Sequence, residues 1–488
     1  MGMIPATFNG EYMEYATIKE KRLEYKISQT KIAEATGFSK AIISSWELGK
    51  NVPSRNDFQI VSNTLLTLID NINNGLNDVR EKRIIKSNTV KKKLPKAITN
   101  SAEYHELLNR VSRVPCAYRD LLSNLYHRAM SQKEKDAPKA IALFSGCGGL
   151  SLGFAAAGFN LVGHVEIDDS ANQIYDANFP NSKILGNDIC GISESQIQHW
   201  RKELGNIDVI IGGPPCQGFS LAGKRDPEDA RNRLFTYYSK IVSLVRPKAF
   251  VFENVRLLTS MKTTDGQLFI NCIFDSFSKA GYHLAKIEVN MADYGVPQSR
   301  ERVVIVGVRN DINADFVFPM ATHQVKLDTY EQSLFKTQNQ LSFRDATCDL
   351  INLESGDVSD DPLHWSVVHP DHVIRWLKNV PEGCSAHDNE DPNLRPPSGF
   401  NTTYKRIKWD EPCSTITTNF SMISGCRNVH PSATRSLTIR EAARAQSFPD
   451  EFVFLGKWGD VRKAIGNAVP PIFAETIANE IKVQVLSK

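Results

Sequence analysis

The cysteine at position 216 has the surroundings expected of a nucleophile. It lies in the segment GGPPCQGFS at 212–220, directly after an apolar run that predicts a buried strand. Pro214 and Pro215 restrict the backbone in front of it and the polar Gln217 follows it, whereas a core cysteine would have apolar neighbours. A thiol acts as a nucleophile when it is exposed and its thiolate is stabilised, for which nearby arginines are suited. The segment therefore predicts covalent chemistry at the end of this strand.

A carboxyl group and two guanidinium groups follow in later segments. FENV at 252–255 places Glu253 at the end of a strand expected beside the first one, and QSRER at 298–302 places Arg300 and Arg302 at the start of another. Folds built from alternating strands and helices bind ligands at the carboxyl ends of their strands. These segments therefore predict that a nucleophile, an acid and a guanidinium converge on one pocket.

A glycine turn at 144–149, FSGCGG, is suited to hold a cofactor. It follows a predicted strand and opens a predicted helix, so its backbone can approach a ligand closely. Such turns serve nucleotides, flavins and S-adenosylmethionine alike, but the absence of Gly-Lys-Ser/Thr excludes a P-loop. Glu166 ends the next strand, where an acid commonly binds ribose hydroxyls, and Asp188 ends the following one, in reach of an adenine amine. Both acids could equally be loop caps.

The strands that carry these groups alternate with helical stretches. IALF, LVGHVEID, IDVIIGGPPC and KAFVFENV predict four strands, and RVVIVGVR at 302–309 predicts a late one. This alternation predicts an α/β fold with a doubly wound, mostly parallel sheet. Residues 310–430 are rich in Pro, Asn, His and Asp and predict an irregular segment, after which helical patterns return at 437–447 and 472–486.

A separate helical unit is predicted over residues 15–67. Gly37 interrupts the helical pattern in the middle, which gives the layout of a helix-turn-helix unit. Ser28 and Ser39 are suited to cap the two helices at their N-termini, and Gly49 to end the second. The apolar residues that recur near helical spacing are Ile27, Ile32, Ala33, Phe38, Ile42, Ile43 and Trp46.

The segment ISQTKIAEATGFSKAIISSWELGKNVPS in this unit resembles the Cro/repressor-like helix-turn-helix family, including its Trp-Glu-x-Gly-Lys stretch. The resemblance implies DNA binding through the N-terminal part of the second helix, which enters the major groove in such folds. A helical hairpin with a purely structural role is the alternative. The residues at the groove would be small or polar, namely Ser39, Lys40, Ala41, Ser44 and Ser45.

The net charge of +3 hides an asymmetry. Residues 1–140 contain 23 Lys+Arg and 15 Asp+Glu, a balance of +8, and the rest contains 35 and 40, a balance of −5. A basic region of this kind suits a polyanionic partner. Eight basic residues lie within 80–96, a run that is either a solvated linker or a contact to phosphates, and connecting helices are expected over 101–131.

The composition excludes several classes of protein. The 488 residues are 41% hydrophobic and 23% charged, which excludes a collagenous or wholly disordered chain. No stretch approaches the ~20 apolar residues of a membrane span, and the N-terminus lacks the pattern of a secretory signal. Nine scattered cysteines without a C-x-x-C pair argue against a zinc site or a disulfide framework. These features predict a cytoplasmic protein of several domains.

From about residue 138 to the C-terminus, the chain resembles the DNA (cytosine-5) methyltransferase family. Eight blocks occur in the family's order: FSGCGG, VEID, NDI, GGPPCQGFS, FENV, QSRERVVIVGVR, LTIREAARAQSFPD and GNAVPP. Ala142 departs from the family's first block, which often carries Asp before Leu-Phe. The resemblance implies the S-adenosylmethionine-dependent methyltransferase fold, double-stranded DNA as substrate, and an irregular target-recognition domain.

The resemblance also implies roles for the residues identified above. Cys216 would attack carbon 6 of a flipped-out cytosine, and Glu253, as a protonated acid, would hydrogen-bond ring nitrogen 3 and its amine. Arg302, together with Arg300, would hold the cytosine oxygen and favour the thiolate, and no metal is required. The S-adenosylmethionine pocket would be lined by Phe144, Gly146, Gly148, Glu166, Ile167, Asp188, Ile189, Leu234 and Asn467, and DNA would be contacted by Gln217, Ser220, Ser39, Lys40 and Ser44.

Two functions of different classes follow from these resemblances. The first is a sequence-specific DNA methyltransferase associated with the nucleoid. It would be the modification enzyme of a restriction-modification system, and the restriction endonuclease of that system would be its partner in function without forming a complex with it. The second is a transcriptional regulator that acts through residues 15–67, with the methyltransferase body as a partner or a relic. The two activities could also coexist, with the N-terminal unit acting as a dimer that represses synthesis of the enzyme itself. The expected boundaries are 1–75 for the helix-turn-helix, 76–137 for the basic linker and connecting helices, 138–310 for the catalytic domain, 311–430 for target recognition, and 431–488 for the return to the catalytic domain.

Overall fold

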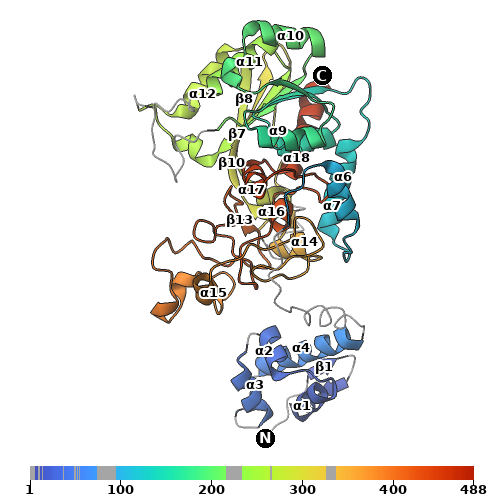
Figure 1. The fold of residues 1–488 in the computed structure, drawn as a ribbon, viewed down its shortest axis with the longest axis vertical. Coiled ribbons are helices and arrows are strands. Elements are labelled where there is room, and N and C mark those ends of the chain that lie inside the picture. Colours follow the sequence, from blue (N-terminus) through green and yellow to red (C-terminus); the bar gives the residue numbers. More distant parts are fainter. Residues whose placement is uncertain are drawn as a thin grey trace. The chain divides into compact units, whose positions relative to one another are not determined.

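The chain divides into two compact units, Met1–Lys91 and Lys92–Lys488, which are described separately (Figure 1). No helix within the described part of this computed structural model is long and apolar enough to cross a membrane. The residues that the structure describes are 6–8, 11–13, 15–36, 38–48, 51, 53, 55–73, 95–215, 234–263, 266–325 and 337–487.

The smaller unit contains the predicted helix-turn-helix. Ser28 Oγ accepts a hydrogen bond from the amide of Lys31 at 3.0 Å, and Ser39 Oγ accepts one from Ile42 at 3.2 Å, so both predicted N-caps are confirmed. Gly37 and Gly49 lie outside the described residues. The elements are a short antiparallel pair, β1 (Ala6–Phe8) and β2 (Glu11–Met13), and the helices α1 (Tyr15–Glu24), α2 (Gln29–Thr36), α3 (Lys40–Glu47) and α4 (Arg55–Asn73).

Only some of the apolar residues that recur at helical spacing in this unit are buried in its core. Ile32, Ile43 and Trp46 are buried in one cluster with residues of α1 and α4, as helical spacing predicts. Ile42 belongs to the same recurring apolar series, but it is 42% exposed and does not enter the core. Successive residues of a helix point about 100° apart, and Ile43 alone of this adjacent pair faces the core.

A buried ion pair fixes the second helix of the motif to the first part of the unit. Arg22 Nε lies 2.6 Å from Glu47 Oε1, and Arg22 Nη1 also donates to the carbonyl of Ile27. Gln29 Nε2 donates to the other oxygen of Glu47 at 2.7 Å. The glutamate at the end of α3 is therefore held from both α1 and α2.

The larger unit is built on a seven-stranded sheet with the order β5-β4-β3-β6-β7-β10-β8. The first five strands are parallel, and β10 is antiparallel to both of its neighbours, so the mostly parallel, doubly wound fold is confirmed. The sequence analysis did not predict β8. The strands are β3 (Lys139–Leu143), β4 (Asn160–Val165), β5 (Lys183–Gly186), β6 (Val209–Gly212), β7 (Ala249–Val255), β8 (Tyr282–Asn290) and β10 (Glu301–Arg309).

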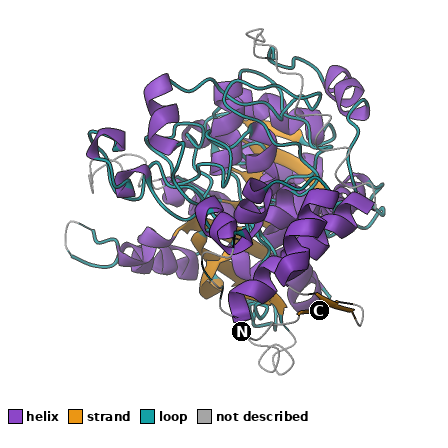
Figure 2. Cartoon of the chain, turned by 90° about the horizontal axis from the view of Figure 1, so that it is seen from below, coloured by secondary structure: helices purple, strands orange, loops and turns teal. Residues whose placement is uncertain are grey.

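Helices cover both faces of this sheet, as Figure 2 shows. Alternate strand residues enter two separate apolar clusters: Ala142 and Val251 lie in one, and Leu143 and Phe250 lie in the other. The first cluster includes α8 (Gly149–Ala156), α9 (Asp169–Asn178), α16 (Ile439–Ala445) and α18 (Pro471–Ile481), and the second includes α10 (Glu194–Leu204), α11 (Leu234–Val245) and α12 (Phe269–Lys279).

The C-terminal segment returns to the first helix of the catalytic fold. A Cβ on Gly153 in α8 would lie 2.4 Å from both the Cβ of Ala474 and the carbonyl oxygen of Pro471, so the glycine allows α18 to pack at close range. The helical patterns predicted at 437–447 and 472–486 are confirmed by α16 and α18, the latter continuing into a π-helical turn at Lys482–Leu486.

The connecting helices belong to the larger unit. Helices α6 (Ser101–Asn109) and α7 (Ala117–Met130) form where helices were expected. Tyr104 OH donates to the carbonyl of Asp450 at 2.7 Å, and Trp458 Nε1 donates to the carbonyl of Pro95 at 2.8 Å. Most of the basic run at 80–96 lies outside the described residues.

Residues 310–430 are mostly irregular, as predicted, and buried ion pairs organise them. Arg444 donates to both carboxylate oxygens of Asp349, and Arg440 Nε donates to Asp361 at 2.9 Å. Both arginines lie on α16, so this helix anchors the irregular segment by charge-assisted hydrogen bonds. The short strands and helices of this segment are β11 (His323–Gln324), β12 (Gln338–Asn339), α14 (Phe343–Thr347), α15 (Asp371–Leu377) and β13 (Cys413–Ser414). Outside the segment, β9 (Gln298–Ser299) pairs with β13, and α17 (Trp458–Asn467) follows α16.

Candidate functional site

The predicted acid and one predicted guanidinium meet between β7 and β10. Arg302 Nε lies 3.0 Å from Glu253 Oε1, and the two side chains are only 14% and 12% exposed. The N–H direction does not make this contact an aligned hydrogen bond, and Glu253 Oε1 has no other partner among the described residues. Burial lowers the pKa of Arg302, and the neighbouring carboxylate offsets part of this effect. The pair therefore presents a buried carboxylate oxygen that is left without a hydrogen-bond partner among the described residues.

The chain that leads to the predicted nucleophile is held beside this carboxylate. Strand β6 pairs with β7, as expected, and Asn254 Nδ2 donates to the carbonyl of Pro214 at 2.8 Å. Asn254 is buried, which makes this bond a fixed anchor two residues before position 216. Cys216 itself lies outside the described residues, as do Gln217 and Ser220.

Gly213 allows the end of β6 to approach the acid closely. A Cβ at this position would lie 2.9 Å from Glu253 Oε2 and 3.2 Å from the carbonyl oxygen of Glu253. We expect Gly213→Ala to displace the carboxylate or the Pro214 segment and to lower kcat by about 10- to 100-fold, since catalytic groups tolerate little misplacement. Steady-state methylation assays and a thermal melt measure the effect.

Gly459→Ala is the matched control for that substitution. The glycine lies in the first turn of α17, and a Cβ there would meet nothing within 4 Å. The control should keep both its turnover and its melting temperature. Equal turnover in the two variants would contradict a constraint at Gly213.

Arg300 does not join Arg302 at the carboxylate. Its guanidinium is buried and donates to the carbonyls of Ile416 and Gly466, both at 3.3 Å. Burial lowers its pKa well below the usual range, and the like charge of Arg302 adds to this effect. Of the two arginines predicted for the pocket, the structure therefore brings only Arg302 to Glu253, whereas Arg300 ties the irregular segment to the end of α17.

Asn254 and Gln298, which FENV and QSRER place at the predicted pocket beside the acid and the arginines, hold the backbone around it. Gln298 is completely buried, accepts from the amide of Ile416 at 2.8 Å and donates to Gln446 Oε1 at 2.9 Å. Asn254 performs the corresponding task for the Pro214 segment. Both belong to recognised motifs, but their burial and their partners depend on contacts between distant parts of the chain.

The glycine turn and Glu166 form a second part of the same sheet edge. Gly146 N donates to Glu166 Oε2 at 2.8 Å, and the amide of Asp168 donates to Oε1 at 2.9 Å. A Cβ on Gly146 would meet nothing within 4 Å, so the turn faces open space. Beside it, Phe144 has a φ of +55° and Ile167 is 68% exposed. A strained aromatic residue, an exposed isoleucine and a fixed carboxylate fit an adenosine-like ligand.

The other predicted pocket residues lie on neighbouring elements. Asp188 caps the 3-10 turn Ile189–Gly191 and accepts from the amide of Cys190 at 2.9 Å, so the expected role of this acid as a loop cap is confirmed. Leu234 begins α11 and Asn467 ends α17. Because β3, β4 and β5 are parallel, the residues that follow them lie at one edge, together with those that follow β6. Gly148 has a φ of +99° and starts α8.

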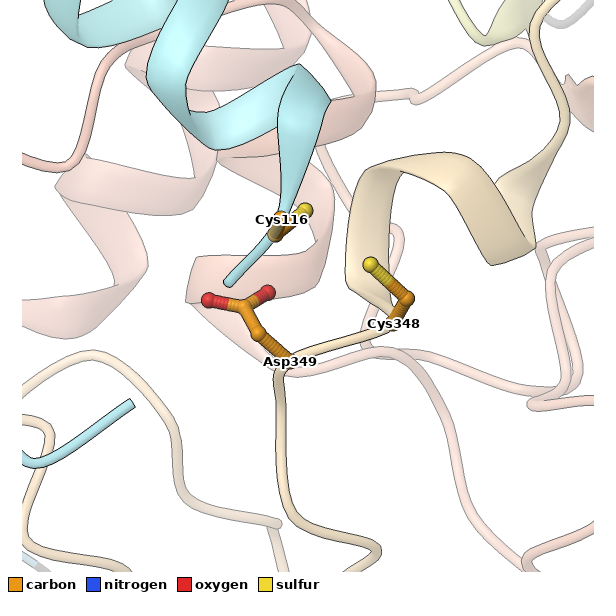
Figure 3. Close-up of side chains that lie close together, drawn as sticks. All are labelled: Cys116, Cys348 and Asp349. Atoms are coloured by element: carbon orange, nitrogen blue, oxygen red, sulfur yellow. The ribbon is translucent and has the colours of Figure 1, made fainter. Parts of the chain in front are cut away.

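One cluster in the described part of the chain has the spacing of metal ligands (Figure 3). The ligand atoms of Cys116, Cys348 and Asp349 lie within 4.8 Å of one another. Arg444 occupies both oxygens of Asp349, and Arg119 Nη1 lies 3.1 Å from one of them. Burial raises the pKa of Cys348 to about 12, so its thiol keeps its proton at neutral pH. We therefore assign this cluster to ion pairing.

Three further cysteines, unlike Cys348, are buried residues. Burial raises the pKa of Cys147 to about 12 and that of Cys426 to about 11. Cys413 is fully buried as well, and burial raises its pKa. These thiols remain protonated and do not act as nucleophiles.

Comparison with known proteins gives consistent matches over the larger unit. Residues 139–483 match the family described as C-5 cytosine-specific DNA methylase, and residues 18–66 match a helix-turn-helix family. Type II methyltransferase M.DdeI of Desulfomicrobium norvegicum is 34% identical over 70% of this chain and 88% of its own length. Type II methyltransferase M1.HphI of Haemophilus parahaemolyticus is 36% identical over 70% of this chain and 86% of its own. A crystal structure of a prophage-encoded protein from E. coli, described as a DNA modification methyltransferase, superposes with a TM-score of 0.55 at 27% identity and covers 72% of this chain and all of that one.

Proposed function

This chain belongs to the C-5 cytosine-specific DNA methylases, and on that premise we propose that it methylates a flipped-out cytosine through a covalent adduct with Cys216. The observation that carries the proposal is the Glu253–Arg302 pair, whose buried carboxylate lies beside the chain that leads to position 216. A cytosine inside a duplex cannot reach a buried pair of this kind, so the base must leave the stack.

The proposed chemistry explains why these residue types are required. Carbon 5 of cytosine is too weak a nucleophile to accept a methyl group directly. Attack of the Cys216 thiolate on carbon 6 turns the ring into an enamine, whose carbon 5 is nucleophilic. Glu253 would bind ring nitrogen 3 and the amine as charge develops, and Arg302 would bind the cytosine oxygen. Carbon 5 would then take up the methyl group as the bond between that group and the donor sulfur breaks. Loss of the proton from carbon 5 and release of the thiolate would restore the ring.

We propose S-adenosylmethionine as the methyl donor of this enzyme. It supplies an electrophilic methyl group when bound. The open face of Gly146, the exposed Ile167 and the fixed carboxylate of Glu166 suit its adenosine part. Phe144 and Ile167 would sandwich the adenine, Glu166 would accept from the ribose hydroxyls and Asp188 from the adenine amine. The remaining pocket residues proposed are Gly148, Ile189, Leu234 and Asn467.

The biological task proposed for the enzyme is sequence-specific modification in a restriction-modification system. Its curated relatives are named Type II methyltransferases, which supports this assignment. We propose that residues 311–430 select the target sequence, that Gln217 and Ser220 contact the DNA, and that a restriction endonuclease shares the target without forming a complex. We propose that the enzyme modifies its DNA in the cytoplasm.

Bisulfite sequencing of DNA from cells that express the protein tests this proposal. We expect the cytosines at one position of one short sequence motif to be protected from conversion by bisulfite. Expression of the Cys216→Ala variant provides the background. Methylation that is absent, or spread over cytosines without a common motif, would contradict a sequence-specific enzyme.

We propose transcriptional regulation as a second function, carried by the N-terminal unit. Its support is the helix-turn-helix match at 18–66 and the exposure of Lys40 on the second helix of the motif. The enzyme body already has a region proposed to read the target, so a second DNA reader suits an operator near the gene of the enzyme itself. Such units commonly bind paired half-sites as dimers.

Deletion of residues 1–75 separates the two functions. Because the larger unit begins at Lys92, we expect the truncated enzyme to keep nearly all of its methylation rate and to lose repression of a reporter driven by its own promoter. Methylation kinetics and reporter activity are measured on the same variants, with Lys40→Ala as a point substitution that should weaken operator binding alone. Unchanged repression after the deletion would exclude the regulatory function.

A further inference from the structure

Helix α3, whose place in the small unit is labelled in Figure 1, carries two exposed apolar residues, Ala41 and Ile42, next to its N-terminus. Ile43 and Trp46 turn inward to the core of the small unit. Lys40, Ala41 and Ile42 form the exposed first turn, and 42% of the Ile42 surface remains accessible. In a helix-turn-helix this first turn is the part that contacts base edges in the major groove.

The polar side chains near this turn are largely engaged within the unit. Ser39 Oγ accepts from the amide of Ile42 as the N-cap, and Ser45 Oγ donates to the carbonyl of Ile42 at 2.9 Å. Asn51 Nδ2 lies 3.4 Å from the same Ser45 hydroxyl. Lys40 and, one turn further along the helix, the partly exposed Ser44 can form hydrogen bonds to bases, whereas Ala41 and Ile42 present only carbon atoms to a base edge.

We propose that Ala41 and Ile42 read the C5-methyl group of a pyrimidine in the major groove. This inference rests on the proposed operator-binding function and specifies what that function recognises. The C5-methyl is the apolar feature of the major-groove edge, and small apolar side chains are its usual partners. Two pyrimidines carry it: thymine, and the 5-methylcytosine that this enzyme family produces.

The two sources have different consequences for the cell. If the methyl group belongs to thymine, the operator is fixed by its sequence alone. If it belongs to 5-methylcytosine, operator occupancy rises as the enzyme modifies DNA, and the product represses further synthesis. The side-chain chemistry is the same in both cases, so base substitution in the probe must distinguish them.

The test uses the full chain without methyl donor, so that no probe is modified during the assay. Sites are selected from random duplexes, and those still bound by the chain lacking residues 1–75 are removed as targets of the larger unit. Each thymine of the remaining operator is replaced by uracil, which lacks only the methyl group, and each cytosine by 5-methylcytosine. We expect one position per half-site to change affinity by about 3- to 5-fold, the effect of burying one methyl group.

Side-chain substitutions connect the effect to α3. Ile42→Ser should remove the difference between methylated and unmethylated probes, whereas Leu48→Ser, at an exposed position beyond the other end of the helix, should retain it. A loss of affinity when thymine is replaced by uracil identifies thymine as the source of the methyl group. A gain of affinity when cytosine is replaced by 5-methylcytosine identifies 5-methylcytosine as the source. Sequence-specific binding that ignores every methyl change would overturn this inference and leave the operator function intact. Absence of any selected operator would overturn both.

Discussion

Cys216→Ala is expected to abolish methyl transfer while DNA and the methyl donor still bind. The substitution removes only the atom that attacks carbon 6, so carbon 5 is never converted into a nucleophile. The residues proposed for the other contacts, among them Glu253 and Glu166, are unchanged in this variant. Transfer of a tritiated methyl group to duplex DNA measures the rate, and gel shift and calorimetry measure the two affinities.

Cys272→Ala is the control, since this cysteine lies on α12, a helix on the second face of the sheet. It should retain activity. A duplex with 5-fluorocytosine at the target should trap the wild-type enzyme covalently only when methyl donor is added, because fluorine blocks the final loss of the C5 substituent. Methyl transfer above background by the Cys216→Ala variant would refute the assignment of the nucleophile.

Glu253→Gln is expected to lower kcat by about 100-fold or more, with a smaller loss of DNA affinity. The amide keeps the size of the side chain and part of its hydrogen bonding, but it lacks the proton that the ring nitrogen requires as charge develops. The substituted side chain lies beside the buried Arg302, whose Nε is 3.0 Å from Glu253 Oε1. An interaction that acts mainly in the transition state produces this division between turnover and binding.

Glu301→Gln provides a matched comparison for this variant. Glu301 precedes Arg302 in β10, but its side chain is exposed and pairs with Arg256 at the surface. Its replacement should change neither turnover nor affinity beyond about 2-fold, the range of exposed ion pairs. Equal losses of turnover and affinity in Glu253→Gln would instead indicate that the acid only positions the base.

The motifs carried most of the functional information because each chemical role demands particular residue types in a short local pattern. The run before Cys216, the acid in FENV and the glycine turn could be identified without any knowledge of distant contacts. The order of strands and helices likewise indicated a doubly wound sheet, since a parallel strand requires a crossover before it. The caps Ser28 and Ser39 depend on neighbours three residues away and were predictable for the same reason.

Tertiary structure decided which of several similar residues reaches each site. Arg300 and Arg302 are two residues apart in one motif, yet one is buried against the carbonyls of Ile416 and Gly466 and the other meets Glu253. Ile42 and Ile43 are adjacent, yet only the second enters the core. Local sequence sets the type of side chain and the local backbone, whereas its direction and burial depend on segments more than a hundred residues away, or on the packing of a whole helix, which spacing alone does not specify.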